Sequence, residues 1–523
     1  MKTSIKILSI VMIAATSLVA EVSNSRPPHI LLILVDDMGY SDLGCYGGEI
    51  NTPTIDALAS NGLRYTQFYN CARCWPTRAS LLSGYYPQQI NRDGVVGVTG
   101  FGGGNGSRPS WARLLPDYLK TAGYRSYHSG KWHIDGQPTG NGFDRSLYLG
   151  DQDRFFSPNK IWRDGKPLPA VKRSEGFYAT TAVADHAIET LKEHQADHAD
   201  KPFFSFVAFT APHFPLQALP EDIARVENRY AVGWDVVRSQ RWERLQEMGL
   251  VTGKLSGVEY DQGPPLDFSK TLNVLGGGEV NLPVLWDDLT EEQKKFQQAK
   301  MTIHAAMIER IDLEVGRIIE QLKAMHAFDD TLIFFLSDNG ASAELMVRGD
   351  GHDPQASPGS ADTYLCLGPG WSTACNTPFR KHKIWTHEGG SCTPLIAHWP
   401  EGISSKGEIR QTSGHVIDLV PTLLDVAGVK ITDQKVAFPG TSIFGKGIER
   451  QRVLWWSHSG NHALRYGNWK LVKTKTGEWE LFNLSEDRAE TNDLAAQQPE
   501  KVMALKKLWE GRVEEFKRDK MGR

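Results

Sequence analysis

The residues with the clearest chemical potential are Cys74, Pro76 and Arg78, in the run Cys74-Trp75-Pro76-Thr77-Arg78. They precede a Leu-rich stretch, residues 79–84, whose composition predicts a helix. Proline is favoured in the first turn of a helix, and the free N–H groups and dipole at a helix N-terminus favour an anion. The run therefore predicts a nucleophile at the start of a helix, beside an anion site. A buried cysteine before a proline-initiated helix is the structural alternative.

Two apolar runs of strand length each end in oxygen-bearing side chains. Residues 29–35 are followed by Asp36 and Asp37, and residues 331–337 are followed by Asp338 and Asn339. Open α/β sheets carry their sites at the carboxyl ends of their strands. Oxygen ligands suit Ca²⁺ or Mg²⁺ rather than zinc, and a buried strand end does not collect three carboxylates without a cation to neutralise them. We therefore expect one divalent cation, calcium in preference to magnesium.

A second set of side chains is cationic or can become so. Lys131 and His133 follow the strand-like residues 124–128, and His213 follows the apolar residues 203–209. The whole set is Arg78, Lys131, His133, His213 and Lys383. A metal beside such a cluster would bind a tetrahedral oxyanion, neutralise its charge and allow its leaving group to be protonated.

These blocks, in this order, resemble the formylglycine-dependent (type I) sulfatases of the alkaline phosphatase superfamily. The resemblance covers about residues 28–400 and rests on residues 29–39, Cys74 to Arg78, Gly130 to His133, Ala211 to His213, residues 332–340 and Pro378 to Lys383 with His387 to Gly390. It implies that Cys74 is oxidised to an aldehyde, 3-oxoalanine (formylglycine), by a formylglycine-generating enzyme during maturation. Trp75 departs from the family pattern, which more often has a small or polar residue at that position.

The resemblance also implies a reaction. The aldehyde is hydrated to a gem-diol, one hydroxyl attacks the sulfur of a sulfate ester, and the other later loses its proton to expel sulfate. Asp338 would accept the proton of the attacking hydroxyl. Arg78 and His133 would orient the diol, with His133 as the candidate base for the elimination.

The remaining roles implied by the resemblance concern the substrate and the metal. Lys131 and Lys383 would hold sulfate oxygens, and His213 would protonate the departing sugar or aryl oxygen. The implied metal ligands are Asp36, Asp37, Cys74, Asp338 and Asn339.

The elements that must position these groups predict an α/β fold. Strand candidates at 29–35, 124–128, 203–209, 331–337 and 394–398 alternate with helical stretches at 111–122, 178–193, 296–326 and 416–427. This pattern predicts a large, mostly parallel sheet sandwiched by helices, alkaline phosphatase-like by resemblance. Shorter strands at 453–457, 462–466, 469–474 and 478–482, then an amphipathic helix near 498–517, predict a smaller C-terminal antiparallel sheet plus helix. The expected domains are a catalytic domain at 27–445, with an insertion at about 214–295, and an α+β subdomain at 446–523.

The N-terminus and the composition bear on location and partners. Lys2 and Lys6 precede an apolar run from 7 to 15, and small residues follow to Ala20, so residues 1–20 are predicted to be a secretory signal peptide. The run is too short to span a membrane. The chain has 523 residues and a net charge of −4, so it lacks the excess of basic residues that is typical of nucleic-acid-binding proteins. We therefore expect an exported protein, periplasmic or secreted, with no nucleic acid and no stable membrane insertion.

Cysteines and aromatic residues add weaker expectations. With Cys74 set aside, five cysteines remain, and Cys366 and Cys375 are the first pair to test for a disulfide. Side chains that could contact a sugar are Trp132, Arg348, His352, Trp371 and Trp385, although core packing is an equal possibility for each.

Three functions remain open at the level of sequence. The leading one is hydrolysis of a sulfate ester, of a sulfated carbohydrate or an aryl sulfate. The second is a phosphonate monoester or phosphodiester hydrolase of the same superfamily, which can share the Cys-x-Pro-x-Arg signature. The third is a catalytically dead, calcium-dependent glycan-binding protein, against which the full set of polar residues argues.

Overall fold

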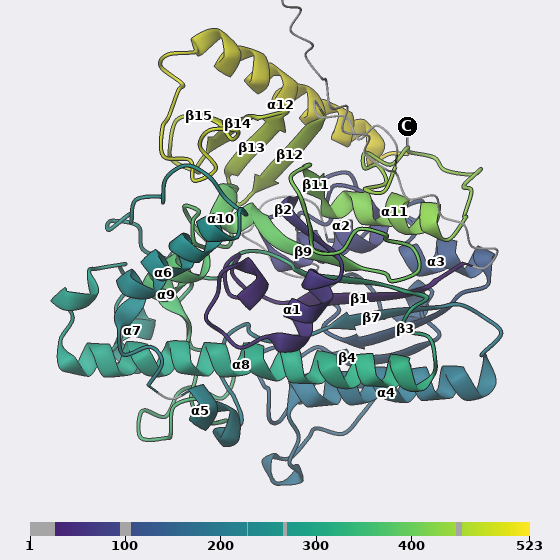
Figure 1. Ribbon diagram of the computed structural model, residues 1–523, viewed down its shortest axis with the longest axis horizontal. Helices are drawn as coiled ribbons and strands as arrows, with labels where there is room; N and C mark the ends of the chain where they lie inside the picture. The colour runs from purple at the N-terminus through teal and green to yellow at the C-terminus, as the bar shows by residue number, and fades with distance from the viewer. Residues whose placement is uncertain (1–26, 95–105, 227, 265–268, 446–451, 523) are drawn as a thin grey trace, which may run out of the picture.

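The structure is a computed structural model that describes residues 27–94, 106–226, 228–264, 269–445 and 452–522 (Figure 1). The predicted signal peptide, residues 1–20, lies outside these ranges. Among the described helices, none combines the length and the apolar character needed to cross a bilayer.

A large mixed sheet forms the centre of the molecule. Across the described residues it has eleven strands in the order β10-β2-β9-β8-β1-β7-β3-β4-β5-β6, with β11 beside β2. The strands are β1 (His29–Val35), β2 (Leu63–Tyr69), β3 (Arg125–Gly130), β4 (Arg145–Leu149), β5 (Ile161–Arg163), β6 (Lys166–Pro167), β7 (Phe203–Ala208), β8 (Thr331–Ser337), β9 (Cys392–His398), β10 (Glu408–Arg410) and β11 (Gly414–His415).

The centre of the sheet is parallel, as the sequence predicted. Strands β8, β1, β7, β3 and β4 run in the same direction, so their carboxyl ends share one edge. The predicted strand at 394–398 is β9, which pairs antiparallel with both β2 and β8. The mostly parallel α/β fold is therefore confirmed, with antiparallel pairing at β9 and again at β4–β5 and β5–β6.

Helices cover both faces of the sheet because alternate residues of each strand point to opposite sides. Leu31, Ile33 and Val35 of β1 pack in one core with α1 (Pro53–Ser60), α4 (Ala179–Asp197) and α8 (Glu291–Ala324). Ile30, Leu32 and Leu34 face a second core with α2 (Cys74–Ser83), α3 (Leu115–Leu119) and α11 (Leu419–Val426). In Figure 1, α4 and α8 lie alongside each other beneath the sheet. Both faces of β1 are thus buried, which explains its uninterrupted apolar sequence.

The region predicted to be an insertion contains α5 (Pro220–Val226), α6 (Gly233–Glu247) and α7 (Ser269–Leu275), and α8 begins at its end. The helix α9 (Gly368–Cys375) packs against α6. The short α10 (Glu388–Ser391) leads directly into β9.

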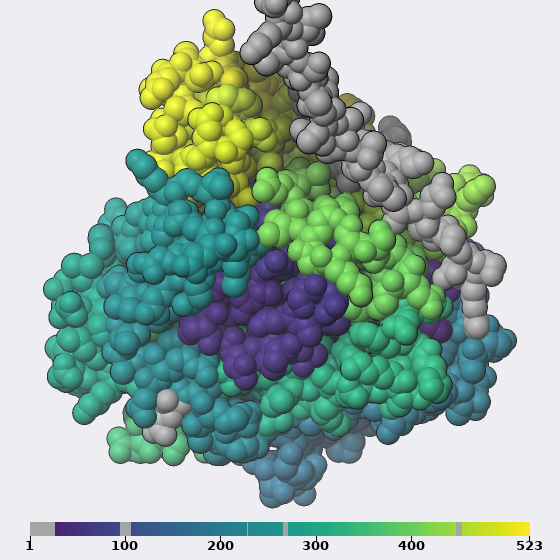
Figure 2. Space-filling model, in the orientation of Figure 1, coloured from purple at the N-terminus to yellow at the C-terminus, as the bar shows by residue number. Residues whose placement is uncertain are grey.

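A second sheet follows near the C-terminus. Its four antiparallel strands, in the order β12-β13-β14-β15, are β12 (Val453–His458), β13 (Asn461–Tyr466), β14 (Trp469–Lys473) and β15 (Glu480–Asn483). One face packs against α12 (Pro499–Asp519) through Trp455, Leu464 and Phe516. Trp456 and Val472, on the other face, belong to the core of the main sheet. Figure 2 shows the resulting lobe in yellow at one end of the molecule. The smaller sheet with one helix is confirmed.

Candidate active site

The four predicted oxygen ligands meet at the ends of two neighbouring strands. In the parallel pair β1 and β8, Val35 lies opposite Ser337, so the residues that follow each strand are neighbours. Asp36, Asp37 and Asp338 are at most 3% exposed. The amide of Asn339 donates to Asp37 Oδ1 at 2.7 Å, which joins the two strand ends directly. The sequence prediction that these side chains lie together is met by this geometry.

The predicted basic side chains lie against the same carboxylates. Lys131 forms an ion pair with Asp36 Oδ2, and Lys383 Nζ lies 2.7 Å from Asp37 Oδ2. Arg78 Nε lies 2.8 Å from Asp338 Oδ2, and its NH1 donates to the carbonyl of Lys131 at 3.1 Å. Each of the three carboxylates therefore has a basic partner supplied by a distant part of the chain.

The donor set fits a divalent cation. Asp36 Oδ1 and Asn339 Oδ1 are buried and have no hydrogen-bond partner among the described residues. Burial, together with neighbouring carboxylates, raises the pKa values of Asp37 and Asp338, whereas Lys131 and Arg78 outweigh burial and lower the pKa of Asp36. The raised pKa values show that the neighbouring basic groups do not fully neutralise these carboxylates. A bound cation would supply the missing positive charge and use the oxygens that have no partner.

Cys74 is the first residue of α2, as the sequence predicted. Every residue of this helix is buried, and Cys74 itself is 3% exposed. Burial raises the pKa of its thiol, although Lys131 and Lys383 lie close enough to oppose the shift. A buried thiol with a raised pKa is a weak nucleophile, so the cysteine as encoded is poorly suited to attack.

The two predicted histidines contact different members of this group. His213 Nε2 is 3.7 Å from Asp37 Oδ2, and the three residues Asp36, Asp37 and His213 are spaced closely enough to share a metal ion. Its Nδ1 contacts the carbonyl oxygen of Phe214, which can only accept, so Nδ1 carries the proton. Burial and then Lys383 hold the pKa of His213 well below its ordinary value. Its Nε2 is therefore unprotonated and presents its lone pair toward Asp37.

His133 contacts the helix that carries Cys74. Its ring lies edge-on to Trp75, with 5.8 Å between ring centroids. Its backbone φ of 57° is in the left-handed region, which is uncommon for a residue with a side chain and is typical of constrained sites. Burial, Lys131 and Arg78 lower its pKa well below the ordinary value. All seven predicted catalytic residues are thus brought to one region.

Three further residues at this site were missed by the sequence analysis. Glu344 is 1% exposed, with its carboxylate 3.3 Å from Lys383 Nζ and 3.1 Å from Arg73 NH2. Arg73 lies over the ring of Trp75 at 5.0 Å. His458, at the end of β12, contacts the other edge of that ring at 5.3 Å. Arg73 could have been suspected as the neighbour of Cys74, but no motif marks Glu344 or His458.

The predicted disulfide between Cys366 and Cys375 is wrong, because both cysteines are free thiols. Cys375 is the last residue of α9 and Cys366 precedes the helix, and their side chains belong to different cores. The thiol of Cys366 donates to the carbonyl of Met346, and Cys375 Sγ lies 3.8 Å from His304 Nε2. Asp42, which completes a buried group with His304 and Cys375, already pairs with Arg241 at 2.7 Å.

The candidate sugar contacts divide into buried and accessible residues. Trp132 and Trp371 are fully buried in the two main cores, so they cannot stack on a substrate. Arg348 lies over Phe214 at 5.5 Å, the same ring that Lys383 approaches at 5.3 Å. Arg348 is therefore the member of this group that the structure places beside the catalytic residues.

Comparisons with known proteins agree with this geometry. The family model described as Sulfatase matches residues 28–429. An uncharacterized sulfatase of Schizosaccharomyces pombe is 31% identical over 93% of both chains. An arylsulfatase of Klebsiella aerogenes is 30% identical over 80% of this chain and 91% of its own. A solved structure in complex with its substrate D-glucosamine-2-N,6-O-disulfate aligns with a TM-score of 0.63 and 20% identity, over 94% of this chain and 98% of the other.

Proposed function

The chain belongs to the sulfatase family, and from that premise we propose that it removes sulfate from a carbohydrate, using a formylglycine made from Cys74 and a bound divalent cation. Its reaction class, hydrolysis of a sulfuric ester, follows from the family and its relatives. The observation that carries the finer proposal is the convergence of three carboxylates and three basic side chains around the N-terminus of α2.

We propose that the cation is calcium and is held by Asp36, Asp37, Asp338 and Asn339, beside residue 74. All four side chains offer oxygen, and two of their oxygens lack partners among the described residues. When bound, the cation would neutralise charge on the sulfate group and orient it. Magnesium is the less suitable ion because it demands a stricter octahedral arrangement.

The chemistry of residue 74 requires its modification. The raised pKa of the Cys74 thiol argues against a thiolate nucleophile at this position. A hydrated aldehyde in its place supplies one hydroxyl to attack sulfur and a second whose deprotonation expels sulfate and regenerates the aldehyde. The modification would be made by a formylglycine-generating enzyme, a partner that acts during maturation.

Lys131 and Lys383 are proposed to bind sulfate oxygens. In the structure these ammonium groups neutralise Asp36 and Asp37. A cation bound by the same carboxylates would take over that neutralisation and leave both lysines free to hold a substrate anion. Arg78, fixed by Asp338 and by the carbonyl of Lys131, is positioned to orient the group on residue 74.

His213 is proposed to protonate the departing oxygen. Its proton on Nδ1 is committed to Phe214, so the transferable proton must be carried by Nε2. The negative charge of a bound sulfate ester, and the charge that develops on its leaving oxygen, would favour that protonated form, whereas burial and the neighbouring lysines oppose it. Asp338 would accept the proton of the attacking hydroxyl. His133 would help to orient the group on residue 74 and act as the base for sulfate release.

The substrate class and location are also proposals. One structural neighbour is described with a disulfated glucosamine as its substrate, which supports a sulfated carbohydrate here. Residues 1–20 are proposed to direct export to the periplasm or the medium. We retain the division into a catalytic domain at 27–445, with its insertion at about 214–295, and a subdomain at 446–523.

Two measurements test the proposal together. Mass analysis of the peptide that contains residue 74, from protein made in a host with the maturation enzyme, should show an aldehyde in place of the thiol. The same preparation should hydrolyse an aryl sulfate faster than an aryl phosphonate. An unmodified cysteine in fully active protein would refute the formylglycine proposal, and a preference for the phosphonate would favour the phosphonate monoester hydrolase instead.

A further inference from the structure

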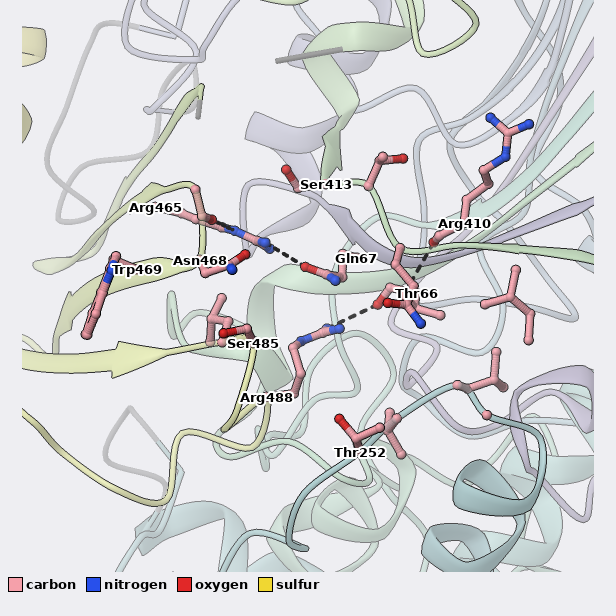
Figure 3. Close-up of a pocket in the computed structure, with 18 of the residues that line it drawn as sticks. Thr66, Gln67, Thr252, Arg410, Ser413, Arg465, Asn468, Trp469, Ser485 and Arg488 are labelled. Carbon is pink, nitrogen blue, oxygen red and sulfur yellow. Dashed lines mark hydrogen bonds between the residues drawn. The ribbon is translucent and has the colours of Figure 1, made fainter. Parts of the chain in front are cut away.

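A cleft of about 810 Å³ lies outside the catalytic group (Figure 3). Three parts of the chain form it: β2 with β10 and the residues after β10, the segment 249–252 after α6, and the β13–β14 turn with residues after β15. None of the seven proposed catalytic residues lines it. Its volume is within the range of roughly 300–1,000 Å³ typical of small-molecule sites.

The charge on the walls of the cleft is one-sided. No aspartate or glutamate is among its lining residues, which include Arg410, Arg465 and Arg488. Arg410 pairs with Glu408 on its own strand, and in Figure 3 its guanidinium lies away from the other labelled side chains. Arg465 and Arg488 lie among those side chains. These two arginines supply its positive charge.

Arg465 is a buried cation with neutral partners. It is 4% exposed, and within the described residues no carboxylate oxygen lies within 4 Å of its guanidinium. It donates to the hydroxyl of Tyr69, the side-chain oxygen of Gln67 and the carbonyl of Gly467. Glu388 lies near enough for Arg465 to act on it, but that carboxylate already pairs with Lys470 and Arg488. Because burying an unmatched charge is costly, an anion in the cleft would be favoured beside Arg465.

Arg488 is 6% exposed and only partly satisfied. Its NH2 contacts Glu388 at 3.1 Å, whereas its Nε has no hydrogen-bond partner in the described part of the chain. Glu388 also pairs with Lys470, which in turn pairs with Glu490. This connected group therefore holds three cations, counting Arg465, against two carboxylates. One positive charge remains, beside a cleft without acidic residues.

The rest of the lining suits a sugar chain. Gln67, Thr252, Ser413, Asn468 and Ser485 offer uncharged donors and acceptors around the cleft, and the ring of Trp469 stands at one end (Figure 3). Aromatic rings and neutral hydrogen-bonding groups beside a cation bind the faces, hydroxyls and anionic substituents of a charged sugar. A single inorganic anion would use only the arginines.

We propose that this cleft is a second, non-catalytic site that holds a sulfated stretch of the polysaccharide on which the enzyme acts. The inference rests on the proposed carbohydrate substrate, and adds that the substrate is polymeric or at least longer than the sulfated unit at Cys74. Sulfate groups on the chain would pair with Arg465 and Arg488, and a sugar ring would lie against Trp469.

The cleft can be tested on the whole protein by electrophoresis through native gels that contain dextran sulfate. The measurement is how far the polymer retards the protein, and gels with unsulfated dextran are the reference. Asn468→Asp is the informative variant because Asn468 is exposed at the β13–β14 turn and its replacement adds a carboxylate to the cleft without disturbing the core. Gln497→Glu is the matched control, since Gln497 is exposed, lies outside the cleft and adds the same charge. Arg465→Gln is a second variant that removes the unpaired cation.

We expect Asn468→Asp and Arg465→Gln each to weaken retardation by roughly tenfold in apparent affinity. Gln497→Glu should behave as wild type. Lys383→Ala should remain retarded, because Lys383 lies outside the cleft. Hydrolysis of a small aryl sulfate should be unchanged in Asn468→Asp, which shows that the variant folds.

Several results would overturn the proposal. Equal retardation of Asn468→Asp and wild type, equal weakening by Gln497→Glu, or loss of retardation in Lys383→Ala would each place the polymer elsewhere. If unsulfated dextran retards the wild type as strongly as dextran sulfate, sulfate has no role in binding. If millimolar inorganic sulfate abolishes the retardation, the cleft is a simple anion site. Failure of the wild type to cleave an aryl sulfate would instead count against the proposed function, and leaves the retardation measurements to decide on the cleft.

Discussion

Replacing Glu344 with glutamine tests whether this residue, which no motif marks, holds the anion-binding lysine in place. Its carboxylate lies between Lys383 and Arg73, at 3.3 and 3.1 Å. Burial acts to raise its pKa, but Arg73 and Lys383 outweigh burial and lower the pKa to about 2 from an ordinary 4.5. That difference corresponds to about 3 kcal/mol of stabilisation in the ionised state. Glu344→Gln keeps the shape and removes the charge, so the free energy of unfolding should fall by about 3 kcal/mol near neutral pH.

The stabilisation by Glu344 should depend on pH. Because the pKa of Glu344 is lowered on folding, its contribution is present above pH 4.5 and is lost as the pH falls towards 2. Urea unfolding followed by tryptophan fluorescence should therefore show a constant gap between wild type and Glu344→Gln at neutral pH, narrowing below about pH 4.5. Lys383 would lose one of its two anionic partners, so the KM for an aryl sulfate should also rise by roughly tenfold.

Glu320→Gln is the matched control. Glu320 forms an ion pair with Lys323 at 2.8 Å on the surface of α8, where its side chain is 70% exposed. Removal of such a pair should cost less than about 0.5 kcal/mol. If Glu344→Gln unfolds at the same urea concentration as Glu320→Gln at neutral pH, the electrostatic account of Glu344 is refuted.

The remaining predictions concern the nucleophile, the metal and the acid. Cys74→Ala should lose sulfate release while its unfolding and its calcium content match wild type; retained turnover would contradict covalent catalysis. Chelation should inactivate the enzyme, calcium should restore it, and Asp36→Asn should weaken metal binding, whereas stoichiometric zinc in the purified protein would contradict the oxygen-ligand site. His213→Ala should slow hydrolysis of a sugar sulfate by about 10²–10⁴-fold and of a nitrophenyl sulfate far less, because phenolate leaves without a proton. Lys383→Ala should slow both esters alike, and equal losses for His213→Ala would make it a sulfate contact instead.

The sequence predicted strands β1, β7 and β8 well, because a strand that is buried on both faces has a continuous apolar sequence. It missed β2, which leads to Cys74, because a register shift between Tyr65 and Phe68 breaks the alternation of its side chains. Arg64 and Gln67 add polarity to this strand although its other residues are buried. An irregular strand of this kind has no simple period to detect.

Other differences come from information that local sequence does not carry. The direction of β9 depends on the path of the chain after Lys383 and α10, so its antiparallel pairing could not be read from five apolar residues. Glu344 lies in a segment without regular structure, and only the tertiary fold brings it to Lys383. Cys366 and Cys375 are close in sequence, but the first precedes α9 and the second ends it, and both are free thiols. The strand ends and the position of Cys74 at the start of α2 were predictable because each is a local pattern, whereas charge partners are not.

The buried carboxylates and lysines of the proposed active site can each exchange one charged partner for another. Asp36 and Asp37 pair with Lys131 and Lys383, so none of these four groups is left in an apolar environment without a counter-charge. A cation that binds the carboxylates and a sulfate that binds the lysines would replace those pairs together. Neither ligand alone restores the pairing, since a cation would leave Lys131 without its carboxylate and Lys383 with Glu344 alone, and a sulfate would leave Asp36 and Asp37 without their lysines. Cation and sulfate should therefore strengthen each other's binding, as the shared lysines and carboxylates require.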